Sequence, residues 1–287
     1  MPIQLLGELV SSHSLTNSST LQILWTMPLF YPPSYLIFEL HSSKLFICSE
    51  ESYISVYSYA KTYLSLIDSF RLSSTEQSSL IHIKSLTASE HLLLVMFNSL
   101  TQSILHLYSH HGYLLHTLSF FNEYISQIRF DNDQLWCLEL ISSNFFYYPI
   151  QSNEYLGNKI LFLSFKDQSF HPFRFALNQT LIAIMDRSTT GILRLYHRRN
   201  TVFYKQIHCP WIDCEPHDIE LTNHFLIYRF SHLIILFDLE TDQYLDGISN
   251  KKNFCITVGK SLNEVIISTS TDDQQSFLIQ SFRPSDY

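Results

Sequence analysis

Glycine and basic residues are scarce in this sequence. Its 287 residues include six Gly, and 18 Lys or Arg stand against 26 Asp or Glu, which gives a formal net charge of −8. This balance counts against nucleic acid or an anionic membrane as the main partner, because both need clustered positive charge. With so little Gly, we expect Ser, Asn, Asp and His to form many of the tight turns.

The sequence also lacks the features of a secreted or membrane-spanning chain. Five Cys is an odd number, and Cys48, Cys137 and Cys255 sit inside apolar strand patterns, where a thiol behaves as a small hydrophobe. The N-terminal segment has no basic region and carries Glu8 where an apolar run would continue. The apolar stretch from Leu21 to Phe30 is too short to cross a bilayer. These features predict a cytoplasmic protein in a reducing compartment, without disulfide bonds.

What the chain does contain is a repeated strand pattern. Seventeen Tyr and 22 Phe, with abundant Leu and Ile, favour strands over helices. A continuously apolar segment follows a short polar turn at residues 44, 91, 134, 180, 224 and 264. Another apolar segment precedes each of these and a further one follows, so the unit recurs at the period of a β-propeller blade, roughly 40–50 residues.

The repeat predicts an all-β fold, a six-bladed β-propeller closed by an N-terminal strand, with seven blades as the alternative count. The last unit lacks a fourth strand, and residues 21–27 stand at the spacing of a fourth strand before the first unit. We expect a single domain over 1–287, in which 1–20 form a tail or an extra strand. The expected blades are 35–70, 80–120, 125–165, 173–209, 218–249 and 254–282.

Two stretches resemble the third and fourth strands of NHL-repeat and WD-repeat propellers: Ser103 to Leu118 and Leu236 to Asp242. The resemblance is one of pattern and covers nearly the whole chain. The repeat pattern is similar to that of the propellers of tripartite-motif-type proteins, although no B-box module accompanies it. The resemblance implies a propeller that binds a protein or an RNA partner.

The densest group of possible metal ligands is His208, Cys209, Cys214 and His217. Two Cys and two His could supply the four ligands of a zinc site. However, Cys-x4-Cys is not a strong zinc spacing, and the group falls where an outer strand connects to the next inner strand. The favoured interpretation is an ordinary loop with two thiols.

Enzymatic propellers offer a second comparison, because lactonase-like members hold calcium with carboxylates at the channel mouth. Six Asp residues are candidates, but they are scattered over several units: Asp131, Asp133, Asp186, Asp213, Asp218 and Asp272. Such residues more often cap turns. Neither a nucleophile elbow nor a Gly-rich phosphate loop is found.

Two other groups have ordinary interpretations. The densest basic patch is expected to be a solvated hairpin: Arg194, His197, Arg198, Arg199 and Lys205. Four His of one unit are expected to be exposed or hydrogen-bonded: His106, His110, His111 and His116. Trp136 lies in a buried strand pattern and is expected in the core.

The hypothesis that follows is a non-catalytic, monomeric protein-interaction scaffold that binds a protein partner through propeller loops. It assigns no catalytic, cofactor-binding or metal residue, no cofactor, and neither a nucleic acid nor a membrane as partner. A metal-dependent hydrolase of the lactonase type, with an ion in the central channel, is the first alternative. An RNA-binding propeller is the second. The identity of the partner and the face that binds it stay open.

Overall fold

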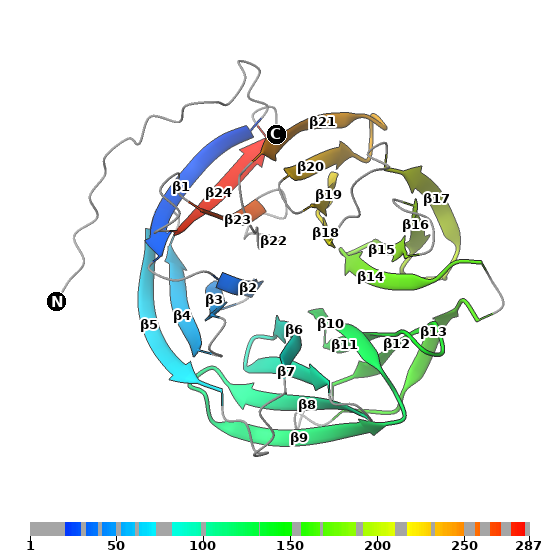
Figure 1. Ribbon diagram of the computed structural model, residues 1–287, viewed down its shortest axis with the longest axis horizontal. Helices are drawn as coiled ribbons and strands as arrows, with labels where there is room; N and C mark the ends of the chain where they lie inside the picture. Colours follow the sequence, from blue (N-terminus) through cyan, green and yellow to red (C-terminus); the bar gives the residue numbers. More distant parts are fainter. Residues whose placement is uncertain are drawn as a thin grey trace.

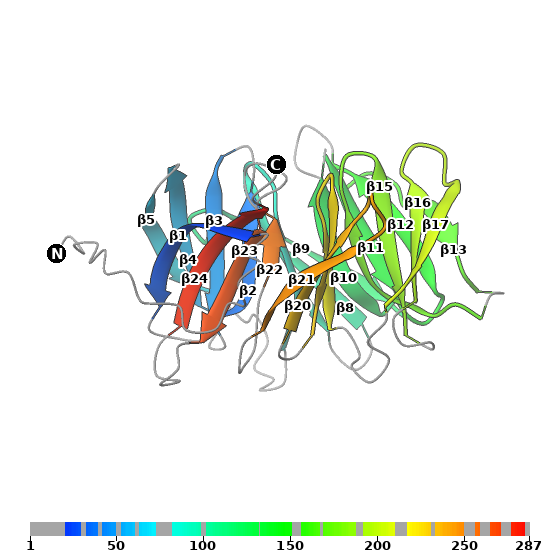
Figure 2. The ribbon, with the colours of Figure 1, turned by 90° about the horizontal axis from the view of Figure 1, so that it is seen from above.

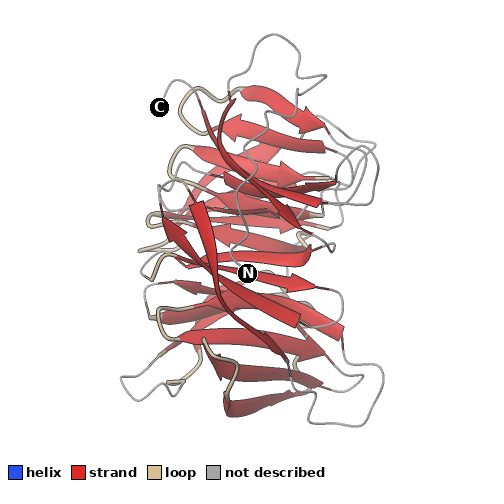
Figure 3. Ribbon diagram, turned by 90° about the vertical axis from the view of Figure 1, so that its left-hand side faces the viewer, coloured by secondary structure: helices blue, strands red, loops and turns tan. Residues whose placement is uncertain are grey.

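The computed structural model describes residues 21–29, 33–39, 42–49, 53–60, 63–72, 82–98, 102–131, 133–150, 156–166, 169–187, 192–209, 217–230, 233–249, 256–258, 265–270 and 277–284. Side chains are described only between residues 33 and 245. Within these ranges every regular element is a β-strand (Figure 3). The same ranges contain no helix with the length and apolarity that a membrane crossing requires.

The strands form antiparallel four-stranded sheets, and in five of the described sheets neighbours in sequence are neighbours in space. We number as blades 1 to 5 the sheets made of β2–β5, β6–β9, β10–β13, β14–β17 and β18–β21. The strands of blades 1 and 2 are β2 (Pro33–Glu39), β3 (Lys44–Ser49), β4 (Tyr53–Ala60), β5 (Tyr63–Arg71), β6 (His82–Ala88), β7 (Leu92–Asn98), β8 (Gln102–Ser109) and β9 (Leu114–Phe121).

The strands of blades 3 to 5 follow in the same order from the inside of the ring to its outside (Figure 1). They are β10 (Ile125–Asp131), β11 (Gln134–Glu139), β12 (Asn144–Pro149), β13 (Ile160–Ser164), β14 (Pro172–Leu177), β15 (Leu181–Asp186), β16 (Ile192–His197), β17 (Phe203–His208), β18 (Asp218–Leu221), β19 (Phe225–Arg229), β20 (Leu233–Asp238) and β21 (Tyr244–Ser249).

A further sheet, which we call the closing sheet, joins the two ends of the described chain. It contains β22 (Ile256–Val258), β23 (Val265–Ser270), β24 (Phe277–Pro284) and, on the outside, β1 (Leu21–Leu29). The register of β1 against β24 runs from Leu21↔Pro284 to Leu29↔Phe277. The inner strand β22 lies between β18 and β2, so the inner strands form a complete ring (Figure 1).

The expectation of an all-β propeller is confirmed, and the blade count needs a correction. Packing between sheets is described for five blades, β2–β21, rather than for the six that the repeat predicted. The closing sheet is a sixth four-stranded sheet, but it is described by backbone pairing alone, because its side chains lie outside the described ones. Residues 1–20, expected as a tail or an extra strand, lie outside the described residues.

The core fills the spaces between neighbouring blades, which stand side by side around the axis (Figure 2). In β7 the side chains alternate: Leu93 and Val95 pack against blade 1, and Leu94 and Met96 pack against blade 3. Successive side chains of a strand point to opposite faces, so a strand between two sheets must be apolar on both. This geometry explains why β7 is buried at Leu92–Phe97 without interruption.

Turns use few glycines, as the composition predicted. Six described residues other than Gly have a positive φ: Ser43, Asn122, Asp133, Ser143, Thr201 and Asp242. Asn and Asp tolerate this left-handed region better than most residues. Gly112, at φ +80°, is different, because a Cβ there would lie 2.3 Å from Cγ of Phe70 in the neighbouring blade. Only glycine fits this turn.

Candidate functional site: a cationic central cavity

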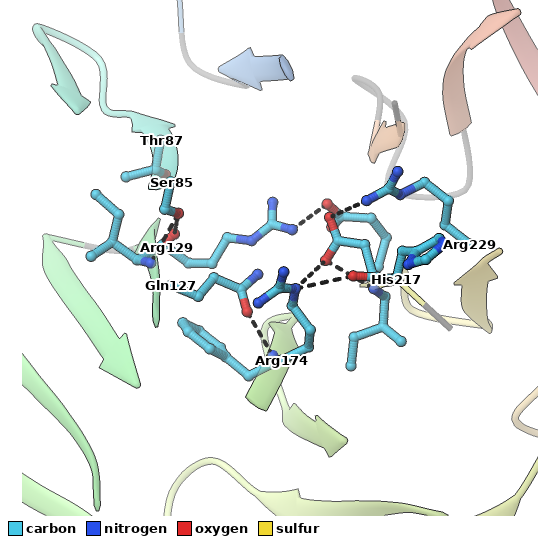
Figure 4. A network of polar contacts seen from close by, with 12 residues as sticks. Ser85, Thr87, Gln127, Arg129, Arg174, His217 and Arg229 are labelled. Atoms are coloured by element: carbon cyan, nitrogen blue, oxygen red, sulfur yellow. Dashed lines mark hydrogen bonds and ion pairs between the residues drawn. The ribbon is translucent and has the colours of Figure 1, made fainter. Parts of the chain in front are cut away.

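The inner strands of the blades border a cavity of about 160 Å³. Its described lining comes from β2, β6, β10, β14 and β18, with one residue from the end of β19. Charged side chains account for much of this lining: Lys84, Arg129, Arg174, Arg229, Asp218 and Glu220. Figure 4 shows three of the arginines converging from different strands.

Side chains from one inner strand satisfy the open backbone edge of the next. The Ser85 hydroxyl on β6 accepts from the Ile128 amide at 3.1 Å and donates to its carbonyl at 3.3 Å. The Gln127 amide oxygen on β10 accepts from the Phe175 amide on β14 at 2.8 Å (Figure 4). An inner strand has one unpaired edge, and buried amides without partners are costly. These bonds hold the inner strands in place around the cavity.

Arg129 and Glu220 form an ion pair across the cavity wall. Both side chains are largely buried, at 17% and 8% exposure. Burial raises the pKa of the Glu220 carboxyl to about 7, although the Arg129 guanidinium favours its ionised form. Burial alone would lower the pKa of Arg129, but the Glu220 and Asp218 carboxylates outweigh that cost and raise it. The cavity therefore contains a carboxyl group that titrates near neutral pH.

The other charges of the cavity are more loosely matched. Asp218 faces two guanidinium groups, with Oδ1 4.0 Å from Nε of Arg174 and Oδ2 3.9 Å from Nη2 of Arg229. These separations exceed hydrogen-bond length. Arg174 donates instead to backbone carbonyls, from Nε to His217 at 3.1 Å and from Nη1 to Phe173 at 3.0 Å. No ion pair among the described residues includes Lys84.

The possible zinc ligands, for which an ordinary loop was the favoured interpretation, do not come together among the residues that the structure describes. Cys209 is buried in the core between blades 4 and 5, while His208 lies on an exposed edge with Nε2 2.8 Å from Nε2 of Gln206. The His217 amide donates to the Arg229 carbonyl. Cys214 lies outside the described residues. Across the described ranges, no three His, Cys, Asp or Glu side chains come close enough to hold one metal ion.

The candidate carboxylates do not converge in the described part of the chain. Asp131 pairs with Arg198, and Asp186 accepts from the His171 amide at 2.8 Å. Asp133 occupies a left-handed turn position at φ 56°. Of the four described candidates, Asp218 alone lines the cavity. The remaining two, Asp213 and Asp272, lie outside the described residues.

The basic patch is held in specific contacts rather than simply solvated. Arg194 stacks over Phe170 at 4.4 Å, and Lys205 pairs with Asp242 of the next blade. Arg198 pairs with Asp131 on the preceding blade and also lies over Trp136, which is buried as expected.

Two of the four expected histidines are buried and two are not. His106 and His110 are 4% and 6% exposed. His111 is exposed and lies 2.9 Å from Asp68 of the neighbouring blade, and its hydrogen bond lowers the pKa of that carboxyl. His116 is half-buried.

The cavity residues were missed from the sequence, although a signal for them exists. Lys84, Arg129 and Arg174 are each the one Lys or Arg of a mostly uncharged inner strand. A charge in such a strand is typical where one face borders a polar channel. Their convergence requires the ring closure, which a single strand does not reveal.

A ring of radially arranged four-stranded sheets around a central cavity defines a β-propeller. No family model matches this sequence, and no curated protein matches it. A solved structure titled "AfRom2 CNH domain" is similar in fold, with a TM-score of 0.53 and 11% identity over 87% of this chain and 80% of that chain. At this identity the similarity shows the fold alone. It supports a propeller, while the NHL or WD type of the repeats stays a prediction.

Proposed function

We propose that this chain is a non-catalytic scaffold that binds a protein partner. The observation that supports this most is the apolar surface of the outer strands. Large hydrophobic side chains are exposed on four of them: Leu66 and Ile67 on β5, Leu115 and Phe121 on β9, Ile160 and Leu161 on β13, and Phe203 and Tyr204 on β17. Large exposed apolar side chains that recur together are typical of protein-interaction surfaces.

The exposure of these residues is high and their position is unusual. Leu66 is 57% exposed, Leu161 is 58% and Phe121 is 72%. Outer strands of a sheet are usually polar, because an open edge must discourage pairing with other chains. In this chain they are the most exposed strands, but they carry apolar side chains beside an open backbone edge. This combination favours a partner that covers the outer strands, and it supports that surface over the propeller loops.

The chemistry of the partner follows from the surface. It presents apolar side chains to the outer strands, and it carries basic groups at its margin to complement a chain of net charge −8. An extended segment could also pair with an open strand edge by β-strand addition. Blades 1 and 2 offer one such surface, because β5 and β9 both present apolar side chains and the turn before β9 packs on Phe70.

The test compares three forms of the chain in proximity capture from cells, with quantitative identification of captured proteins. A Leu66→Ser, Phe121→Ser double variant should lose a defined subset of partners. A Ser65→Thr, Ser119→Thr double variant, on the same strands, should keep them. Each partner lost must then bind the purified wild-type chain and not the double variant. If all three forms capture the same proteins, the outer strands do not carry the interaction.

The non-catalytic part of the proposal needs its own measurement. Elemental analysis of the purified chain, together with lactone and ester turnover assays, addresses the hydrolase alternative. Stoichiometric divalent metal with turnover lost in an Asp218→Asn variant would overturn the scaffold proposal. No observation in the described part of the chain favours the hydrolase or the RNA-binding alternative. Monomeric state and cytoplasmic location stay predictions.

A further inference from the structure

The central cavity gathers positive charge in an acidic chain. Its described lining holds four cations and two carboxyl groups, whereas the whole chain has a net charge of −8. Within the cavity, Glu220 is matched by Arg129, and Asp218 is shared by Arg174 and Arg229 at the limit of ion-pair distance. Lys84 completes the set without an ion pair among the described residues. The described part of the lining thus has an excess of about two positive charges.

Such an excess has a physical cost unless something compensates it. Like charges brought together in a partly desolvated site disfavour their own ionised forms. Arginine stays charged nonetheless, since its guanidinium does not deprotonate in proteins. An anion in the cavity would relieve the repulsion between the cations that line it, among them Lys84, Arg174 and Arg229. Figure 4 shows that Arg174 and Arg229 approach the cavity from two sides.

The chemistry of the donors selects the ligand. Guanidinium groups match the planar and tetrahedral oxyanions, phosphate and sulfate in particular, and an ammonium group binds phosphate as a point charge. The cavity volume of about 160 Å³ accommodates a small oxyanion. We propose that the central cavity of the propeller binds a small, doubly charged oxyanion through Lys84, Arg174 and Arg229, with a phosphate group as the natural ligand.

The first experiment measures binding of the bare anion to the purified chain. Isothermal titration with inorganic phosphate, in a low-salt buffer with chloride as the only other anion, should show one saturable site. A Lys84→Gln variant should bind about tenfold more weakly, because one charge-assisted hydrogen bond is lost. Lys166→Gln, which removes the same charge from an exposed turn, is the matched control and should bind like the wild type.

The outcomes of this titration are decisive. No saturable phosphate binding to the wild-type chain at millimolar concentration would overturn the proposal, and so would equal losses in Lys84→Gln and Lys166→Gln. A second titration with glycerol phosphate separates the two sources of the group. Tighter binding than inorganic phosphate assigns the site to a phosphate monoester, and weaker binding assigns it to the free ion. Both results support the oxyanion site.

The pH dependence gives an independent readout. Sulfate keeps its double charge across neutral pH, so any change in its affinity reports on the protein. Lowering the pH from 8 to 6 protonates Glu220, removes one negative charge and releases Arg129, so sulfate should bind more tightly at pH 6. The other charged groups that line the cavity with Glu220 come from four other strands and from its own strand β18. They are Lys84, Arg129, Arg174, Arg229 and, on β18, Asp218.

A Glu220→Gln variant separates this carboxyl from the other groups. It should bind sulfate tightly at pH 8 and show little further change at pH 6. A sulfate affinity that is the same at both pH values in the wild-type chain would contradict the role of Glu220. Because Glu220 is buried in an ion pair, its variant must first be shown to fold by circular dichroism, and the Lys84→Gln titration stands without it. These measurements need no protein partner, so they stay separate from the scaffold proposal.

Discussion

His110 should make this protein sensitive to mild acid. Its imidazole is buried at the interface between blades 1 and 2, with Nδ1 2.8 Å from Nζ of Lys44 and Nε2 3.0 Å from the Ser89 carbonyl. Nε2 therefore carries the hydrogen and donates to Ser89, and Nδ1 accepts from the Lys44 ammonium. A second proton on the ring would be buried and would face that ammonium, with no acceptor for it at Nδ1.

The magnitude follows from the pKa. Burial, with the Lys44 charge, lowers the pKa of His110 from 6.5 to about 4. Between these values the unfolded chain binds a proton that the folded chain does not, so stability is lost as the pH falls. From pH 7 to pH 5 the free energy of unfolding should fall by about 2 kcal/mol through this residue alone.

Urea denaturation followed by tryptophan fluorescence, at pH 7 and at pH 5, measures this loss. His110→Gln keeps a donor toward Ser89 but cannot titrate. Between pH 7 and pH 5 the wild type should therefore lose about 2 kcal/mol more of its free energy of unfolding than this variant does. His91→Gln, whose wild-type side chain is 72% exposed, is the control and should follow the wild type. If wild type and His110→Gln lose the same stability between the two pH values, the reasoning on His110 is refuted.

Two further predictions concern the packing between blades. Gly112→Ala should cost about 2–4 kcal/mol, because it adds backbone strain at φ +80° to a Cβ placed 2.3 Å from Cγ of Phe70; an unchanged urea midpoint would contradict this. Phe145→Ala should cost about 3–5 kcal/mol, since the ring is fully buried with its centroid 5.3 Å from that of Trp136. Phe121→Ala, on the exposed face of β9, should change stability by about 0.5 kcal/mol or less, and equal thermal shifts for the two Phe variants would show that the core is misplaced.

Much of the fold could be predicted because its signal is local. The continuous burial of β7 and the alternation of half-buried and exposed residues in β9 both follow from the pattern of consecutive residues. The spacing of the repeats also placed residues 21–27 at the outer position of the last sheet, and β1 (Leu21–Leu29) occupies it. Turn residues followed composition, since Ser, Asn and Asp supply most of the described left-handed positions.

The site could not be predicted in the same way because it is assembled from several blades. Arg129 and Glu220 are 91 residues apart and meet only when the inner strands close into a ring. The described members of the possible zinc group illustrate a related point, because neighbours in sequence need not point together: Cys209 is buried in the core while His208 lies on an exposed edge. The exposed apolar surface of the outer strands could not be predicted for a third reason. The sequence alone does not distinguish an apolar residue that packs in the core from one that lies exposed on an outer strand.

The pairing of β1 with β24 has a consequence for the kinetics of folding. The two strands are about 250 residues apart in the chain, whereas each blade is built from hairpins between neighbours. Long-range contacts form slowly, because the entropy of closing the intervening loop must be overcome first. On the ribosome β1 is synthesised before every other described strand, yet its partner emerges only after all five blades. An apolar strand with both edges open must therefore wait for the whole ring, and this interval is when the nascent chain is most exposed to misassembly and most in need of a chaperone.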